Sequence, residues 1–422
     1  MVSWLYSVAL GVFFVGLLPG ILAQMLLRGK YRRGIRERFG AVASWEGAMA
    51  PIWLHTVSVG EVMAAAPLAL ALRSRRPQIP LLVSTTTETG RAVAEQRLPA
   101  DRFVFFPLDF GWVVRRTLGR LQPRLVLLTE TELWPNFLAA CAGLGIPVVV
   151  VNGRLSSRSF PRYRLVRWWF GRVLRNVRLF CMQSSQDAER IVALGAPTDR
   201  VKVTGNLKYD FPSFDKVVDV ATLRRSLGLP AGRRLVVAGS THRGEDEMVL
   251  EAFRTVAKSR PDLCLLLAPR HPERLEEVER LVGRAGLPCV RRSCAEAEPP
   301  REGGVILLDT MGELAKLYAA AAVVFIGGSL IPHGGQNILE PAAHGRPVIH
   351  GPHMANFTEM RDRFREAGAA IQAEDATGLL RALEALLDDP AEAERMGEAG
   401  RGIVAAHRGA TERTADLVDA LL

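Results

Sequence analysis

The sequence predicts an α/β protein with two doubly wound domains, preceded by an apolar N-terminal helix. The chain of 422 residues is too long for one ordinary core, and its 48% hydrophobic content is ample for two. Continuously apolar segments alternate with stretches long enough for helices, which is typical of parallel strands buried on both faces. The alternation restarts after residue 230, which indicates a second domain of the same kind.

The first 28 residues predict a membrane anchor. Residues 2–27 carry no charged side chain, and about 20 apolar residues suffice to span a bilayer. Six cations follow between Arg28 and Arg38, whereas a signal peptide carries its charge before the apolar run. The positive-inside rule then places residue 28 onward in the cytoplasm, with these cations against anionic headgroups. A buried or interfacial helix is the alternative, because glycine and proline interrupt the run.

The first predicted domain covers residues 29–210. Its expected strands are 51–57, 79–85, 102–108, 124–130, 146–152, 178–184 and 201–205. Intervals of helical length separate several of them, so a mostly parallel sheet is expected.

The second predicted domain covers residues 211–422, and the linker falls within 206–230. Its expected strands are 234–240, 263–269, 305–309, 322–328 and 347–351. Two such domains enclose a cleft, and ligands are expected there, at the carboxyl ends of the strands.

The net charge of +10 indicates an anionic partner, which is a nucleic acid, an acidic membrane surface or a phosphorylated substrate. Nucleic-acid binding is not expected, because aromatic residues make up only 7% and the densest basic run adjoins the anchor. The five cysteines form no C-x-x-C pair. They predict neither a zinc site nor a disulfide framework, and we interpret them as reduced core thiols of a cytosolic protein.

Acidic residues follow two of the expected strands in the first domain. Glu61 stands at the first turn, where a carboxylate repels phosphate, so this domain is not expected to hold a nucleotide. A base that deprotonates a hydroxyl suits the position, and a structural acid at a helix start is the alternative. Glu130 and Glu132 are either a metal pair or one inward and one structural acid; without a D-x-D motif no metal is expected. Lys208, in "GNLKYD", is a further candidate whose alternative is a surface lysine.

The second domain has the features of a site for a phosphorylated ligand that carries a ribose. Strand ends near residues 240 and 269 each lead into a short loop and a helix start, whose free N–H groups attract anions. Arg270 adds a guanidinium suited to phosphate. The segment 325–348 carries five glycines, which let backbone approach a ligand, and Glu340 is placed to accept both hydroxyls of a ribose.

Eight motifs follow the N-terminal apolar segment, in the order "HTVSVGE", "ETELWPN", "NGRLSSRSF", "GNLKYD", "STHRGE", "PRHPER", "DTMGEL" and "GGSLIPHGGQNILEPAAHG". With these motifs in this order, the chain resembles the bacterial 3-deoxy-D-manno-octulosonic acid (Kdo) transferases that act on lipid A precursor. The resemblance covers nearly the whole chain. One departure is Gln336, where family members often carry histidine.

The resemblance implies two Rossmann-like domains of the glycosyltransferase B type. It implies an inverting transfer of Kdo from CMP-Kdo to the lipid A precursor (lipid IVA) at the inner membrane, without a metal or other cofactor. Glu61 matches the general base of the family, and Glu130 and Lys208 match residues that support the transition state. The positions that match the CMP-binding residues are Pro269, Arg270, Met311, Gly312, Glu313, Asn337, Ile338, Leu339 and Glu340.

Three other functions remain alternatives at this stage. A non-hydrolysing nucleotide-sugar epimerase would share the architecture but needs no apolar leader. A different membrane-bound glycosyltransferase is closer, and protection by UDP instead of CMP would reveal it. A lipid- or nucleic-acid-binding module without activity rests on charge alone.

Overall fold

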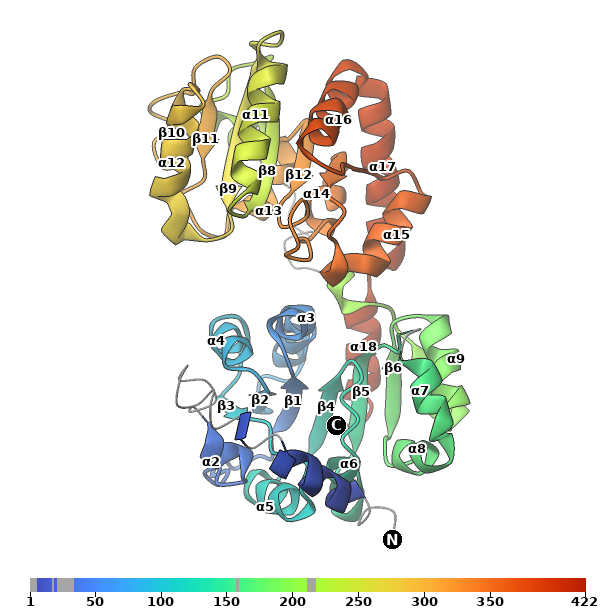
Figure 1. Ribbon diagram of the computed structural model, residues 1–422. Coiled ribbons are helices and arrows are strands. Elements are labelled where there is room, and N and C mark those ends of the chain that lie inside the picture. The colour runs from blue at the N-terminus through green and yellow to red at the C-terminus, as the bar shows by residue number, and fades with distance from the viewer. Residues whose placement is uncertain (1–5, 17–18, 21–33, 157–158, 211–217) are drawn as a thin grey trace. The chain divides into compact units, whose positions relative to one another are not determined.

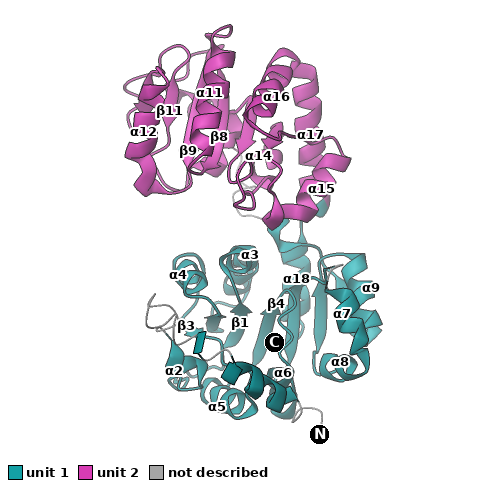
Figure 2. Cartoon of the chain, in the orientation of Figure 1, with its two compact units in different colours: residues 1–211, 407–422 teal, residues 212–406 magenta. Residues whose placement is uncertain are grey.

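The computed structural model describes residues 6–16, 19–20, 34–156, 159–210 and 218–422 (Figure 1). The chain divides into two compact units (Figure 2). Unit 1 comprises residues 1–211 and 407–422, and unit 2 comprises residues 212–406. Each unit contains, within the described ranges, a sheet of seven strands.

The sheet of unit 1 has the order β3-β2-β1-β4-β5-β6-β7, and its paired strands are parallel. The strands are β1 Ile52–Thr56, β2 Leu81–Thr85, β3 Arg102–Phe105, β4 Leu125–Thr129, β5 Val148–Gly153, β6 Leu179–Met182 and β7 Val201–Val203. The α-helices are α2 Ile35–Arg38, α3 Val59–Arg75, α4 Glu88–Arg97, α5 Gly111–Leu121, α6 Pro135–Gly143, α7 Phe160–Leu165, α8 Arg167–Leu174, α9 Ser185–Ala193 and α18 Ala410–Asp419. Two short 3-10 helices are η1 Thr198–Arg200 and η2 Leu207–Tyr209.

Helices cover both faces of this sheet, which explains why its strands read as continuous apolar runs. One face packs against α3, α4 and α18, and the other packs against α5, α6, α8 and α9. Neighbouring residues of β1 show the alternation, since Trp53 belongs to one core and Leu54 to the other, and both are fully buried. The doubly wound arrangement predicted from the sequence is confirmed for this unit.

The sheet of unit 2 has the order β10-β11-β9-β8-β12-β13-β14, and its paired strands are also parallel. The strands are β8 Arg234–Thr241, β9 Leu263–Pro269, β10 Cys289–Arg291, β11 Val305–Leu307, β12 Val323–Ile326, β13 Val348–His350 and β14 Ala370–Gln372. The α-helices are α10 Val220–Ser226, α11 Glu245–Ala257, α12 Leu275–Arg284, α13 Leu314–Leu317, α14 Leu339–Ala343, α15 Thr358–Glu366, α16 Ala376–Asp388 and α17 Pro390–His407. The 3-10 helices are η4 Pro272–Arg274, η5 Tyr318–Ala320 and η6 Ala355–Phe357.

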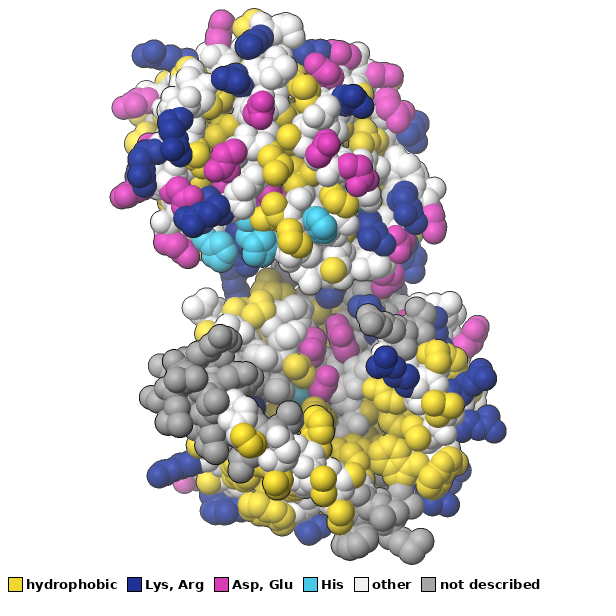
Figure 3. Space-filling view, in the orientation of Figure 1, with side chains coloured by type: hydrophobic (Ala, Val, Ile, Leu, Met, Phe, Trp, Pro, Cys, Tyr) yellow, Lys and Arg dark blue, Asp and Glu magenta, His cyan; other side chains and the backbone are white. Residues whose placement is uncertain are grey.

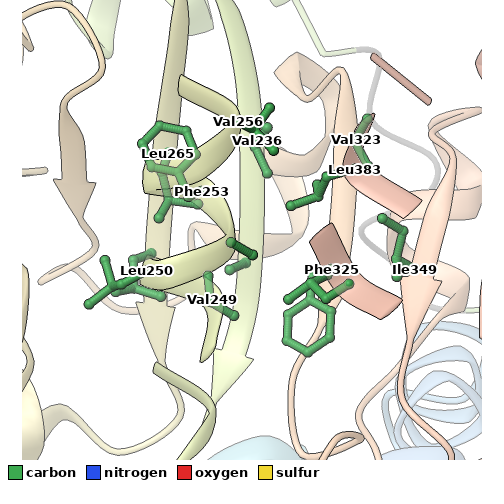
Figure 4. Packing of buried hydrophobic residues seen from close by; sticks show 14 of the residues in the cluster. Val236, Val249, Leu250, Phe253, Val256, Leu265, Val323, Phe325, Ile349 and Leu383 are labelled. Atoms are coloured by element: carbon green, nitrogen blue, oxygen red, sulfur yellow. The ribbon is translucent and has the colours of Figure 1, made fainter. Parts of the chain in front are cut away.

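A large apolar cluster joins one face of this sheet to α11, α12 and α16. In Figure 4, Val249 and Phe253 of α11 lie against the strand that carries Val236, and Leu383 lies beside Val323. The twelve expected strands of the two sheets are all confirmed. Two strands at the sheet edges, β10 and β14, were not expected, because each has only three residues and too little apolar character to stand out.

The C-terminal helix α18 belongs to unit 1, so the division of the chain differs from a single boundary at residue 210. Ala415 and Val418 of α18 are fully buried in the core that α3 shares. Arg75 at the end of α3 forms ion pairs with three acids of the C-terminal segment, Glu412, Asp416 and Asp419. The chain therefore returns to its first unit after completing the second.

The N-terminal helical stretch over residues 6–16 packs on unit 1. Tyr6 hydrogen-bonds to Asp109 and its ring lies 5.8 Å from that of Trp169, while Phe14 meets Phe110 edge-on at 5.8 Å. The expected anchor over 1–28 falls partly outside the described residues. Among the helices that are described, none is long and apolar enough to cross a membrane.

The five cysteines are free, but they do not all lie in the cores. Cys141, Cys181 and Cys264 are buried, as expected. Cys289 and Cys294 are exposed, so the interpretation as core thiols is wrong for these two. Cys289 lies on the edge strand β10, where solvent reaches one side.

Candidate active site

The strand order defines a switch point in each sheet, where the chain crosses from one side of the first strand to the other. In unit 1 the chain runs outward from β1 to β3 and then returns to β4 on the other side of β1. In unit 2 it makes the same reversal between β8 and β12. Because the loops beyond the carboxyl ends diverge at such a switch point, ligands of doubly wound folds bind there. The space-filling view shows acidic side chains grouped on the viewed face of unit 1 and histidines grouped on unit 2 (Figure 3).

Glu61 bridges the switch point of unit 1. It lies in the first turn of α3, and its Oε2 accepts hydrogen bonds from the backbone N–H of Val57 at 2.9 Å and from the hydroxyl of Thr129 at 2.6 Å. Thr129 ends β4, so the carboxylate reaches from the loop after β1 to the neighbouring strand. Its Oε1 has only a long contact of 3.5 Å with the Ser58 hydroxyl among the described residues. One carboxylate oxygen is thus held in place while the other can accept a further proton or hydrogen bond.

Two more acids lie beside Glu61. Glu130 directly follows β4 in a left-handed conformation with φ of 52°, which is costly for a residue other than glycine. Such outliers concentrate at functional sites. Glu132 accepts a hydrogen bond at 3.0 Å from the indole N–H of Trp134. The structure therefore brings Glu61, Glu130 and Glu132 together, as their places at strand ends predict.

The proximity of these acids, together with burial, shifts their titration. Burial is the main cause that raises the pKa of Glu61, the hydrogen bonds from Thr129 and Val57 oppose it, and the charge of Glu130 adds to it. Burial and then the charge of Glu61 raise the pKa of Glu132 to about 7. A carboxylate with a raised pKa is a stronger base, and proton transfer works best when this pKa lies near the working pH. The arrangement can take a proton from a bound hydroxyl.

Lys208 is presented by a network of amide side chains. It lies in η2, and Asn206, which caps the start of η2, donates a hydrogen bond at 3.1 Å to the side-chain oxygen of Gln183. The backbone N–H of Leu207 donates to the side-chain oxygen of Asn152 at 3.0 Å, and Asn152 has a left-handed conformation near the end of β5. These contacts tie η2 to the ends of β5 and β6, and η2 packs against α3. The segment that carries Lys208 therefore lies beside the helix that carries Glu61.

A glutamate also bridges the switch point of unit 2, but its carboxylate is fully used. Glu245 begins α11 and is completely buried. It accepts hydrogen bonds from the backbone N–H groups of Gly328, Ser329 and Leu330 at 2.6, 2.9 and 2.9 Å, and from that of His242 at 3.1 Å. It holds the glycine-rich turn after β12 against the end of β8. The motif "STHRGE" marked its surroundings, but nothing local in the sequence indicated this role.

The predicted donor residues lie at neighbouring strand ends of unit 2. Arg270 follows β9, and its backbone N–H donates to the carbonyl of Thr241 at the end of β8, at 2.9 Å. Burial raises the pKa of the Glu340 carboxyl, at the start of α14, to about 7. The charge of Arg270 opposes this effect. Asn337 donates a hydrogen bond to Glu340 at 3.2 Å, and its side-chain oxygen accepts one from Leu339 N–H at 3.1 Å. These residues form one polar group that can bind hydroxyls and an anion.

The segment from Met311 to Glu313 follows β11, and part of it already interacts with other residues of the protein. The Glu313 carboxylate forms ion pairs with Arg292 at 3.1 Å and with Lys316 at 3.2 Å, which contribute to a lowered pKa. Met311 is 74% exposed, and Gly312 has φ of 78° with no atom near the position of a side chain. We infer that backbone and Met311, more than the Glu313 carboxylate, are available to a ligand here. Throughout the described parts of both units, no group of three or more histidine, cysteine or acidic side chains is arranged to hold a metal ion.

The two units together have a known type of fold. The UDP-GlcNAc 2-epimerase from Neisseria meningitidis, solved bound to UDP-GlcNAc, aligns with 87% of this chain and 99% of its own, with a TM-score of 0.58 and 14% sequence identity. At this identity the likeness establishes the fold alone. The chain has the two parallel-sheet domains of glycosyltransferase B type proteins.

Sequence comparison then gives the family. The family described as "3-Deoxy-D-manno-octulosonic-acid transferase (kdotransferase)" matches residues 33–211. The 3-deoxy-D-manno-octulosonic acid transferase of Haemophilus influenzae is 36% identical over 395 residues, which cover 92% of this chain and 91% of that protein. The Bordetella pertussis transferase is 38% identical over 426 residues, 96% of each chain. The chain belongs to the Kdo transferase family and is a glycosyltransferase.

Proposed function

We propose that this protein transfers Kdo from CMP-Kdo to the lipid A precursor in lipopolysaccharide biosynthesis, with Glu61 as the general base. Membership in the family supports the reaction. The observation that carries the residue assignment is that only one carboxylate oxygen of Glu61, at the switch point of unit 1, accepts short hydrogen bonds. An oxygen held by Val57 and Thr129 orients the group, and the second oxygen remains for an acceptor hydroxyl.

In this mechanism the acceptor hydroxyl loses its proton to Glu61 as its oxygen attacks the anomeric carbon of Kdo. The bond between that carbon and the phosphate oxygen breaks, CMP departs, and attack from the opposite side inverts the configuration. No metal is required in the proposed reaction. Glu130 and Lys208 stabilise the charges that develop.

Unit 2 would hold the donor and unit 1 the acceptor. Arg270 would bind the phosphate, and Glu340 would accept the ribose hydroxyls with Asn337 orienting it. Pro269, Ile338 and Leu339 would contact CMP, as would the segment from Met311 to Glu313. The support for this division is that the acidic switch point repels phosphate whereas Arg270 attracts it.

We further propose that residues 1–28 attach the enzyme to the cytoplasmic face of the inner membrane. The described part of this segment supports attachment, because Val12, Phe13 and Val15 are each at least 64% exposed while Tyr6 and Phe14 pack on unit 1. An apolar helix face of this kind partitions into the boundary between headgroups and acyl chains. The sequence that follows is rich in cations, which favours binding to anionic lipids.

The test is transfer of labelled Kdo from CMP-Kdo, generated in situ, to tetraacyl lipid A precursor. The wild-type protein is compared with Glu61→Gln, and CMP binding is measured for both. Transfer by the wild type alone, with CMP binding retained in the variant, supports the proposal. Equal transfer by both moves the base to Glu130 or Glu132, and a folded wild type that does not transfer refutes the proposed substrates.

A further inference from the structure

Three backbone amides of the glycine-rich turn after β12 are not available to a ligand. A turn of this kind at a strand end commonly binds phosphate through backbone N–H groups. Here the N–H groups of Gly328, Ser329 and Leu330 all donate to the buried carboxylate of Glu245. An anion at the switch point of unit 2 must therefore be bound by other groups.

Three imidazoles meet at this point from three different loops. The ring of His242, after β8, stacks on that of His333, after β12, with centroids 4.5 Å apart and planes at 26°. The ring of His271, after β9, meets His242 edge-on at 5.6 Å. Figure 3 shows histidine side chains gathered on unit 2. His242 is buried beneath the other two, which are exposed.

The hydrogen bond between His242 and Ser240 determines which ring nitrogen is left for a ligand. Nδ1 lies 3.1 Å from the carbonyl oxygen of Ser240, so this nitrogen carries the proton in the neutral ring. Nε2 is then an acceptor and can donate to an anion only after the ring gains a second proton. Glu245 lies 3.9 Å from Nδ1, but its oxygens already accept four N–H groups.

Burial and the surrounding charges keep His242 neutral in the absence of an anion. Burial is the largest of the causes that together lower its pKa to about 4, and the charges of His333, His271 and Arg270 are the others. The groups that face His242 are thus two imidazoles and a guanidinium, with Glu245 beneath. An anion among them would reverse the effect, because a negative charge favours the protonated ring.

We propose that His242, His271 and His333 form, with Arg270, a subsite for an oxyanion of the donor, and that His242 takes up a proton from solvent when this oxyanion binds. The subsite rests on the proposed function, since the donor carries the anion. CMP-Kdo supplies two oxyanions near the reacting carbon, the phosphate and the carboxylate of the sugar. Product CMP retains only the phosphate.

Proton uptake is measured by calorimetry of CMP binding at one pH in two buffers of different ionisation enthalpy. Wild-type protein is compared with His242→Asn, which keeps a donor for Ser240 but lacks Nε2, and with His333→Ala at an exposed position. His353→Asn is the matched control, because it is an exposed histidine of unit 2 outside the cluster. Steady-state KM for CMP-Kdo is measured for the same four proteins.

If the phosphate occupies the subsite, wild type and His353→Asn take up a fraction of a proton with CMP, whereas His242→Asn takes up none and both cluster variants bind CMP roughly tenfold more weakly. If the carboxylate occupies it, CMP binding is unchanged and KM for CMP-Kdo rises by roughly that factor. Unchanged CMP affinity, proton uptake and KM in both cluster variants overturn the subsite but leave the proposed function. Failure of the wild type to bind CMP or use CMP-Kdo overturns both.

Discussion

The two units use the same topology and place a glutamate at the same point, yet the two carboxylates are in opposite situations. Glu61 lies in the first turn of the helix after the first strand of unit 1, and Glu245 begins the helix after the first strand of unit 2. Each reaches across the switch point to the strand beyond. Glu245 is fully buried and accepts four backbone N–H groups, whereas Glu61 is partly exposed and has one oxygen with only a long contact.

This difference distinguishes a carboxylate whose hydrogen bonds are all made within the protein from one that can still accept a proton. A carboxylate that satisfies four donors has no capacity to accept a proton without losing hydrogen bonds. Unit 2 therefore shows what a purely structural acid at the helix start looks like, and Glu61 does not look like it. The same comparison explains the chemistry of the two sites, since one is acidic and the other is built from imidazoles and a guanidinium.

The largest expected effect is on catalysis by Glu61→Gln. The amide keeps its size and can still accept from Val57 and Thr129, but it cannot take up a proton. We expect kcat to fall by about 10²–10⁴-fold, with CMP affinity and thermal stability close to those of the wild type. Initial rates of Kdo transfer, calorimetry with CMP and a melting curve measure the three quantities. A variant that loses stability instead of activity would show that Glu61, like Glu245, is a structural residue.

The next effect is on stability, and it belongs to Glu245→Gln. One oxygen becomes an NH₂ group that faces N–H donors of the turn, in a fully buried place. We expect the free energy of unfolding to fall by about 2–4 kcal/mol, which chemical denaturation of the full chain would measure. Glu247→Gln, on the same helix, is the control. If Glu245→Gln keeps its stability but loses transfer, the comparison is wrong, because Glu245 would then act in the reaction and not only in the structure.

A smaller effect concerns pH and sharpens the description of the acidic site. The pKa of Glu132 is raised to about 7, so between its ordinary value and 7 the folded protein binds more protons than the unfolded chain. The free energy of unfolding contributed by this group therefore decreases as pH rises through that window. Glu132→Gln cannot lose a proton, and its melting temperature should fall less than that of the wild type between about pH 5 and about pH 8. The exposed substitution Glu298→Gln should follow the wild type; equal slopes for all three proteins would contradict the assignment.

The smallest effect is expected where the chain returns to unit 1. Arg75 pairs with Glu412, Asp416 and Asp419, but the first two of these acids are 66% and 69% exposed. We expect Arg75→Ala to lower the free energy of unfolding by less than about 1 kcal/mol, with a loss that shrinks at high salt. Val418→Ala should cost about 1–3 kcal/mol, because it opens a cavity in the core. The reverse ranking would mean that charge, not burial, holds α18.

Local patterns account for much of what could be predicted. Apolar runs located the strands of both sheets, and polar residues after them located Glu61, Glu130 and Arg270. The two missed strands, β10 and β14, are short edge strands in which no residue is buried, so burial leaves little apolar pattern in their sequence. Likewise, the packing of α18 on α3 joins residues more than 300 positions apart, and no local signal carries such a contact.

By itself the sequence determined the class of fold and the set of polar residues at the strand ends, because buried parallel strands and strand-end loops leave local traces. Only the tertiary structure decided which of these side chains already form hydrogen bonds within the protein and which can still bind a ligand. Glu245 accepts hydrogen bonds from a turn that lies more than 80 residues further along the chain. The ring of His333 stacks on that of His242 across a similar separation in sequence. The physical reason is that hydrogen-bond capacity is shared between strands that become neighbours only in the folded sheet.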